Sequence, residues 1–260
     1  MSDAMRQYGQ AAKGQPGNIL AAVGHAQTQL KLGMCISPDG CILYSCSTDE
    51  VSAAMHSLET LIQAQNQTPS IEATAMLASI RAVPRPGMSS TEIAQAKLNA
   101  RELYDKVAKA LHLPEASHQV TNGHANALTR SQRKVAEDVE LHVEIAKLWF
   151  EEDSSRAERG LQEALRLSER DGKASPRLVN NLGALQHMAA RYESARPLYE
   201  RSLMDATSSG NAADEGASTT ILYNLARLYE DQGDNTAAKA AYEKLLSRHP
   251  EYTDGANSLI

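Results

Sequence analysis

Residues 219–250, "TTILYNLARLYEDQGDNTAAKAAYEKLLSRHP", carry the clearest alternation of apolar and polar positions along the chain. Apolar side chains recur three and four residues apart in two blocks, and a polar turn around Gly233 separates the blocks. This spacing predicts two amphipathic helices, and Pro250 ends the second. Small residues stand where two antiparallel helices would cross, and large residues stand beside them: Ala226 and Ala238, then Leu222, Leu225, Tyr229, Tyr242 and Leu245. We expect Tyr242 to be buried between the helices.

The same pattern returns upstream, and it resembles the tetratricopeptide repeat of about 34 residues. Gly183 and Ala226 stand at equivalent positions 43 residues apart, and the polar loop 208–216 accounts for the nine extra residues. In residues 175–206 the matching positions hold Val179, Leu182, Gly183, Ala195, Tyr199 and Ser202. The resemblance implies an all-α fold, a right-handed α-solenoid of helix-turn-helix repeats. Because the chain begins and ends inside repeats, we expect a segment of a longer solenoid. The expected divisions are 1–16 (second helix of an incomplete repeat), 17–66 (a repeat interrupted by an insertion at 34–50), 69–111 (repeat), 112–135 (polar linker), 136–170 (repeat), 175–206 (repeat), 207–218 (linker), 219–250 (repeat) and 251–260 (start of a truncated repeat).

The insertion at 34–50 holds all three cysteines of the chain, Cys35, Cys41 and Cys46, in an apolar stretch. It exceeds the length that the repeat period needs by about 16 residues. The cysteine spacing lacks the paired arrangement of a zinc site, and one stretch of this length cannot close a β-propeller. Two interpretations stay open, a surface loop with a small hairpin or a translated intron. Neither gives the cysteines a chemical role.

Composition favours helices and limits the kinds of partner. The chain is 42% hydrophobic but only 4% aromatic, which suits closely packed helices better than a sheet sandwich. The net charge of −6 argues against direct binding of nucleic acid. No apolar run approaches the roughly 18 residues of a membrane span, and the low cysteine content fits a reducing compartment. We therefore expect no membrane association and a location in the cytosol or nucleus.

The sequence carries no signature of nucleotide binding, zinc proteolysis or serine hydrolysis. "SQRK", residues 131–134, matches a serine–lysine pattern, but a capping serine beside solvated basic residues explains it better. Trp149 falls at a core position of its repeat, and Asp153 or Ser154 is expected to cap the helix that follows. The sequence thus predicts a protein that is not an enzyme, with no catalytic residue, no cofactor and no metal.

The predicted function lies on the concave face, which the first helices of successive repeats line. Asn, Tyr and Arg side chains on that face can hydrogen-bond the backbone of an extended peptide, and ordered helices lose little entropy on binding it. The plainer alternative for each residue is an ordinary polar surface. The candidate partner-binding residues are Arg177, Asn180, His187, Tyr223, Arg227 and Glu230.

Three stretches carry a more specific resemblance: "LVNNLGALQHMAARYESARPLYERSL" at 178–203, "YNLARLYE" at 223–230 and "HPEYTD" at 249–254. Together they resemble the family of large tetratricopeptide subunits of the polymerase-associated factor complex. That resemblance implies a nuclear scaffold that holds the namesake and parafibromin-type subunits of the complex. It implies only indirect association with RNA polymerase II, in support of transcription elongation and the histone modification coupled to it.

The alternative function is that of a generic tetratricopeptide adaptor or co-chaperone that binds a peptide C-terminus. Such a carboxylate clamp needs asparagine at a position that Asn181 and Asn224 occupy. It also needs Lys and Asn where Asn180 and Ala184 stand, and the basic pair of the third repeat is lacking. The sequence therefore disfavours this alternative.

Overall fold

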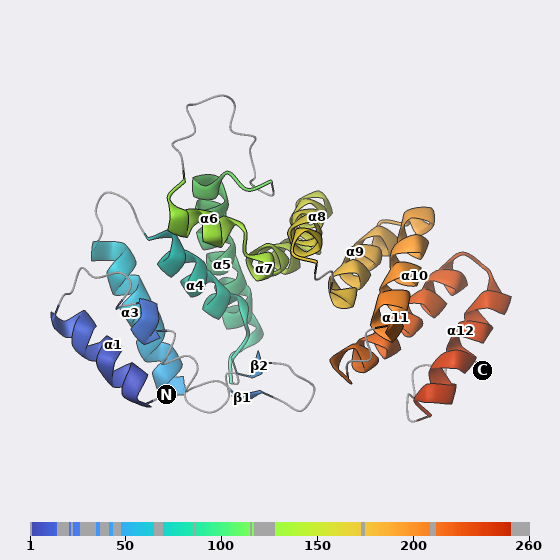
Figure 1. The fold of residues 1–260 in the computed structure, drawn as a ribbon, viewed down its shortest axis with the longest axis horizontal. Coiled ribbons are helices and arrows are strands. Elements are labelled where there is room, and N and C mark those ends of the chain that lie inside the picture. Colours follow the sequence, from blue (N-terminus) through green and yellow to red (C-terminus); the bar gives the residue numbers. More distant parts are fainter. Residues whose placement is uncertain are drawn as a thin grey trace. The chain divides into compact units, whose positions relative to one another are not determined.

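The computed structural model describes residues 2–14, 21, 23–26, 35–36, 42–43, 48–64, 70–85, 87–114, 116, 128–172, 175–208 and 212–250. The chain divides into two compact units, Met1–Glu137 and Asp138–Ile260. Helices dominate both units (Figure 1). The prediction of an all-α fold built from packed helix pairs is confirmed. The repeat expected to begin in 251–260 lies outside the described residues.

The first unit places α3, α4 and α5 side by side, with α4 and α5 as its principal helix pair. Ser70 caps α4, because its hydroxyl oxygen accepts a hydrogen bond from the Ala73 amide. Ser89 and Glu92 form a reciprocal capping box at the start of α5. The elements of this unit are α1 (Ser2–Gly14), β1 (Cys35–Ile36), β2 (Ile42–Leu43), α3 (Thr48–Ala64), α4 (Ile71–Ala82), α5 (Ser90–Leu111) and α6 (Arg130–Ala136).

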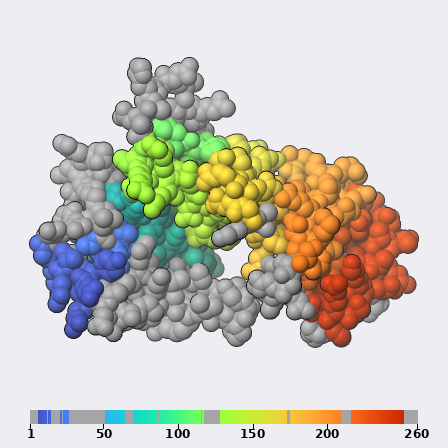
Figure 2. Space-filling view, viewed as in Figure 1, coloured from blue at the N-terminus to red at the C-terminus, as the bar shows by residue number. Residues whose placement is uncertain are grey.

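The second unit contains three successive helix pairs, α7–α8, α9–α10 and α11–α12. Figure 2 shows the orange surface of α9 and α10 continuous with the red surface of α11 and α12. The helices are α7 (Val139–Trp149), α8 (Ser154–Arg170), α9 (Pro176–Met188), α10 (Tyr192–Ser208), α11 (Ala212–Asp231) and α12 (Asn235–Arg248). Asp153 caps α8, which selects it over Ser154, the other predicted cap.

Small residues bring the two helices of each pair close together. At Gly183 of α9, an added Cβ would lie 2.9 Å from Cδ1 of Tyr199, so only glycine leaves room for the ring. At Gly160 of α8, an added Cβ would lie 3.2 Å from the His142 carbonyl oxygen. The large side chains beside these crossings are buried, and Tyr242 is 1% exposed, as predicted.

The core around Trp149 contains a buried cation. Trp149 is 8% exposed, in agreement with its predicted core position. The guanidinium carbon of Arg156 lies 3.6 Å from the centroid of the Trp149 ring, and Arg156 itself is 3% exposed. Stacking on an aromatic face is one of the few ways to place a guanidinium in a core, and it explains why this arginine is buried.

The polar segments expected between repeats contain more helix than predicted. Within the segment expected as a linker at 112–135, α6 begins at Arg130, and Thr129 caps it in a box with Gln132. The predicted capping serine, Ser131, lies inside this helix instead. The linker expected at 207–218 is also shorter, because α10 continues to Ser208 and α11 begins at Ala212.

The insertion at 34–50 contains an antiparallel pair of short strands. Cys35 pairs with Leu43 and Ile36 with Ile42. This agrees with the interpretation as a loop with a small hairpin, while the intron interpretation stays a prediction. The helix that follows, α3, begins at Thr48, inside the expected insertion. The cysteine predictions for Cys41 and Cys46 lie outside the described residues.

Candidate partner-binding surface

The candidate surface is formed by α9 and α11, the first helices of two successive repeats, which contact each other in the second unit. Polar contacts join them, and two of these lie in different turns of α9. The side-chain amide of Asn224 donates to Oδ1 of Asn180 at 3.0 Å. His187 Nε2 lies 2.8 Å from Oδ2 of Asp231. We call these two contacts the α9–α11 ladder.

Asn180 was predicted to bind a partner, but in the structure it bonds to Asn224 within the fold. Asn180 is 7% exposed, and its carbonyl oxygen accepts from Asn224. A buried amide whose oxygen is bonded within the protein has little left to offer a peptide backbone. Asn180 therefore holds the two helices together as its main task. Asn224 is a site residue that the sequence did not predict, although Asn181 occupies the equivalent position of the preceding repeat and this repetition was a usable signal.

His187 is also held within the fold. Its ring meets those of Tyr192 and Tyr199 edge to face, with centroids 5.7 and 6.1 Å away. Its Nδ1 lies 3.5 Å from the Tyr199 hydroxyl oxygen, while Nε2 faces Asp231. Both ring nitrogens thus have partners, and the ring is mostly shielded. His187 supports the surface rather than projecting from it.

A second network fixes the side chains of α11. The Tyr242 hydroxyl donates to Oε2 of Glu230 at 3.0 Å, and the same oxygen accepts from Arg227 at 3.0 Å. The ring of Tyr223 packs edge to face on that of Tyr242, with centroids 6.2 Å apart. The hydroxyl of the buried Tyr242 therefore orients the Glu230 carboxylate, and this carboxylate orients Arg227.

Charge on this surface is concentrated at Arg227. Burial, the largest single influence, lowers the pKa of the Arg227 guanidinium, but Glu230, Tyr242, Asp231 and Tyr223 together outweigh it, so that the pKa is raised. Arg227 stays cationic and exposed, with N–H groups beyond the one that Glu230 accepts. Arg177 is exposed at the start of α9. Met188 presents an apolar side chain, 64% exposed, at the end of the same helix.

The structure thus divides the six predicted residues into two groups. Arg177 and Arg227 are exposed and Tyr223 is half-buried, so these three can reach a partner. Asn180, His187 and Glu230 are engaged in contacts that position the helices or the exposed residues. The arrangement offers donors, a cation and an aromatic face, which suit binding of an extended chain.

Two further features are absent from the part of the chain that the structure describes, a metal-ligand cluster and a membrane-spanning helix. No group of three or more His, Cys, Asp or Glu side chains is placed to hold a metal ion there. Within the same residues, no helix combines the length and apolarity of a membrane span.

Comparison with known proteins supports the repeat assignment. Residues 221–252 match the family model described as Tetratricopeptide repeat. Over 118 residues, 45% of the chain, the sequence is 30% identical to "Tetratricopeptide repeat protein 1" of Schizosaccharomyces pombe (strain 972 / ATCC 24843). The aligned part spans 11% of that curated relative.

Solved structures share the fold at low sequence identity. YrrB, described as "a TPR protein with an unusual peptide-binding site", superposes with a TM-score of 0.64 and 10% identity, covering 96% of each chain. BtubC (BKLC) from P. vanneervenii superposes with a TM-score of 0.59 and 17% identity, covering 96% of this chain and 88% of the other. Residues 221–252 thus carry a tetratricopeptide repeat, and the helix pairs of the chain share the fold of solved tetratricopeptide-repeat structures.

Proposed function

We propose that this scaffold binds an extended segment of a partner subunit across α9 and α11, within a nuclear complex that accompanies transcription elongation. The partner belongs to an assembly of the polymerase-associated factor type, such as its namesake or parafibromin-type subunit. RNA polymerase II is reached through these subunits, without direct contact with nucleic acid.

The single observation that carries this proposal is the α9–α11 ladder together with the network below Arg227. The two contacts of the ladder fix the spacing of α9 and α11, and Tyr242 and Glu230 fix the direction of Arg227. A partner that meets a preorganised surface orders fewer side chains on binding, so more of the contact energy appears as affinity. The peptide-binding site named for YrrB supports a peptide as the partner.

The choice of an elongation complex rests on sequence. "YNLARLYE" at 223–230 includes the exposed Arg227 and the half-buried Tyr223 and also carries the specific family resemblance. The match over 118 residues to a much longer curated tetratricopeptide protein supports a chain that works as part of an extended repeat array.

Replacing Tyr223 and Arg227 together by alanine tests the surface. We expect the double variant to lose co-purification of elongation-complex subunits from nuclear extract, because it removes the aromatic face and the exposed cation. Because Tyr223 packs on Tyr242, Arg227→Glu alone is the second variant, since it reverses charge without touching the core. The matched control is Lys239→Ala with Lys244→Ala, two exposed cations of α12.

Circular dichroism must show equal helicity in all variants. Undiminished recovery of partner subunits by both surface variants would place the interface on another part of the protein. Recovery of chaperones instead of elongation subunits by the unmodified chain would favour the co-chaperone alternative and contradict the proposal.

A further inference from the structure

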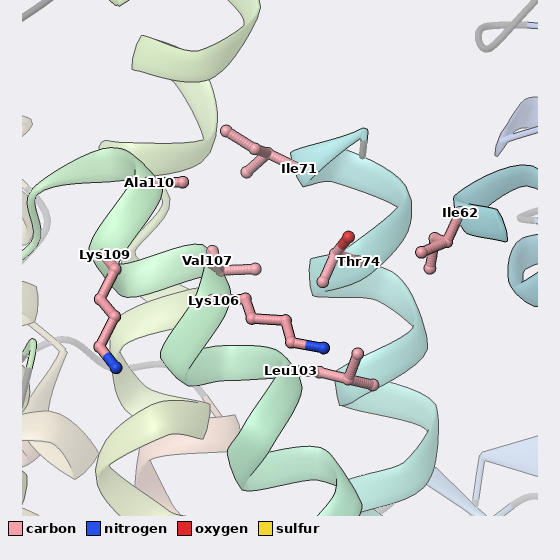
Figure 3. A pocket seen from close by; sticks show the side chains of 8 residues that line it. All are labelled: Ile62, Ile71, Thr74, Leu103, Lys106, Val107, Lys109 and Ala110. Atoms are coloured by element: carbon pink, nitrogen blue, oxygen red, sulfur yellow. The ribbon is translucent and has the colours of Figure 1, made fainter. Parts of the chain in front are cut away.

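A pocket of about 540 Å³ lies in the first unit, far from the surface on α9 and α11 in sequence (Figure 3). Three helices contribute to it: the end of α3, the first turns of α4 and the last turns of α5. Its volume falls within the range of roughly 300–1,000 Å³ that is usual for ligand pockets. The lining residues are Ile62, Ile71, Thr74, Leu103, Lys106, Val107, Lys109 and Ala110.

The walls of the pocket are apolar. Val107 and Leu103 form its buried floor, and Ile62 and Ile71 are half-buried side chains that leave apolar surface facing outward. Thr74 adds no free donor, because its hydroxyl donates to the Ser70 carbonyl oxygen at 2.8 Å. An occupant must therefore bring aliphatic groups, which gain by leaving water.

The three helices are held in place without an occupant. Arg81 of α4 forms an ion pair with Glu59 of α3 at 2.6 Å. The hydroxyl groups of Ser79 in α4 and Tyr104 in α5 are 2.9 Å apart, within hydrogen-bond distance. Because α4 is tied to both neighbours, the pocket is part of the folded unit and does not have to open for binding.

Lys106 gives the pocket a charge. In Figure 3 its ammonium group lies between α5 and α4, on the side of Thr74 and Leu103. Among the residues that the structure describes, Lys106 has no carboxylate partner. Lys109 differs, since its ammonium lies 3.6 Å from Asp105 and points away from the other lining side chains in Figure 3. The pocket thus combines an apolar floor with one unpaired cation at its edge.

We propose that this pocket docks an acidic peptide segment of another protein, with an aliphatic side chain in the pocket and a neighbouring carboxylate on Lys106. The carboxylate complements the unpaired cation, and the aliphatic group covers Leu103 and Val107. A peptide fits better than a fatty acyl chain, because Lys106, Lys109 and Ala110 are exposed and leave one side of the pocket open to water. This inference does not rest on the proposed function, since none of its residues belongs to α9 or α11.

The test uses the full chain and a short fluorescein-labelled peptide in which leucine and glutamate residues stand next to each other between serine spacers. We expect saturable binding by fluorescence polarisation, which added salt weakens. Lys106→Glu should weaken it by about tenfold, because attraction becomes repulsion. Lys106→Gln should weaken it less, and Ala110→Phe should abolish it by filling the pocket. The matched control is Lys97→Glu, the same change at an exposed site of α5 outside the lining.

Location is read separately by labelling isoleucine methyl groups for NMR. The peptide should shift the methyl signals of Ile62 and Ile71. Equal affinity of a peptide with lysine in place of glutamate would overturn the proposal. So would unchanged binding by both Lys106→Glu and Ala110→Phe. If decanoate, used as a free aliphatic carboxylate, bound in place of the peptide, the occupant would be a lipid. Concentration-dependent dimerisation that Ala110→Phe removes would assign the pocket to a second copy of the chain, and would also overturn it.

Discussion

The repeats α9–α10 and α11–α12 solve the same packing problem with different residues at equivalent positions. Where the helices cross, the first repeat has Gly183 and the second has Ala226. Each then buries a tyrosine beside the crossing, Tyr199 or Tyr242, and each is 1% exposed. The hydroxyl of each tyrosine meets the residue at the same place in the first helix, which is His187 in one repeat and Glu230 in the other. Each repeat therefore buries a tyrosine whose hydroxyl has a hydrogen-bond partner, and that partner can be either a histidine or a glutamate.

The turns between the helices of the two repeats also share a backbone conformation but use different residues. Gly233 adopts φ +77° and Ala190 adopts φ +56°, so both turns need the left-handed region. Each turn closes with the same pair of hydrogen bonds, from Ala190 and Arg191 in one repeat and from Gly233 and Asp234 in the other. Only the second repeat uses the residue that adopts this conformation without strain.

Removing a buried tyrosine should have the largest effect in this comparison. Tyr242→Ala should lower the free energy of unfolding by about 3–5 kcal/mol, because the cavity between well-packed helices cannot collapse fully. Tyr242→Phe keeps the ring and loses only the bond to Glu230, so it should cost about 1 kcal/mol. Urea unfolding followed by circular dichroism measures both, and an unchanged midpoint for Tyr242→Ala would contradict the packing described.

The crossing position should separate the two repeats next. Gly183→Ala should destabilise by about 1–3 kcal/mol, because the new Cβ meets the Tyr199 ring. Ala226→Gly, the reverse change at the equivalent position, should cost about 1 kcal/mol through helix propensity. Combining Gly183→Ala with Tyr199→Leu should cost less than the two changes separately, because the obstructing ring is gone. Strict additivity in that double-mutant cycle would mean that the ring is not what excludes the methyl group.

Alkaline pH should distinguish Tyr199 from a phenylalanine at the same site. Burial raises the pKa of the Tyr199 hydroxyl above its ordinary value of 10.0. Above that pH the unfolded chain loses the proton while the folded chain keeps it, so stability is intact below pH 10.0 and falls as pH rises further. The wild-type protein should therefore lose up to about 1.4 kcal/mol more per pH unit than Tyr199→Phe. Parallel stability curves for the two proteins between neutral and alkaline pH would refute this.

Exchanging the turn residues should give the smallest effects, with opposite signs. Ala190→Gly should stabilise the protein by about 1 kcal/mol, since it relieves a left-handed alanine. Gly233→Ala should destabilise by a similar amount. Thermal melts of the two variants measure this, and a shift in the same direction for both would show that the two turns are not equivalent.

The sequence predicted the helix pairs because their core positions recur with a fixed period. Tyr242, Trp149 and the Asp153 cap lie where the pattern places them. Boundaries were harder, since α6 depends on a box between Thr129 and Gln132 that lies inside an otherwise polar stretch. A periodic hydrophobic pattern cannot reveal a helix of which none of the described side chains is buried.

The roles of the residues on the candidate surface were harder to predict from the sequence than the helix pairs. The repeat position of a residue indicates which side of a helix it occupies, but not whether a neighbouring helix already uses its polar atoms. Asn180 and His187 face the expected side, yet Asn224 and Asp231 engage them. Their partners lie 44 residues away in each case, a separation that only the stacking of the two repeats determines.

The α9–α11 ladder has a mechanical consequence. Its two contacts lie in different turns of α9, at Asn180 and at His187, so α11 is attached to α9 at two separate points, here called pins. A single pin would let α11 pivot on α9, whereas two pins oppose both twisting and sliding. Under tension along the repeats, α9 and α11 should therefore resist as one stiff element, and the chain should yield first at junctions between helices that lack such a pair.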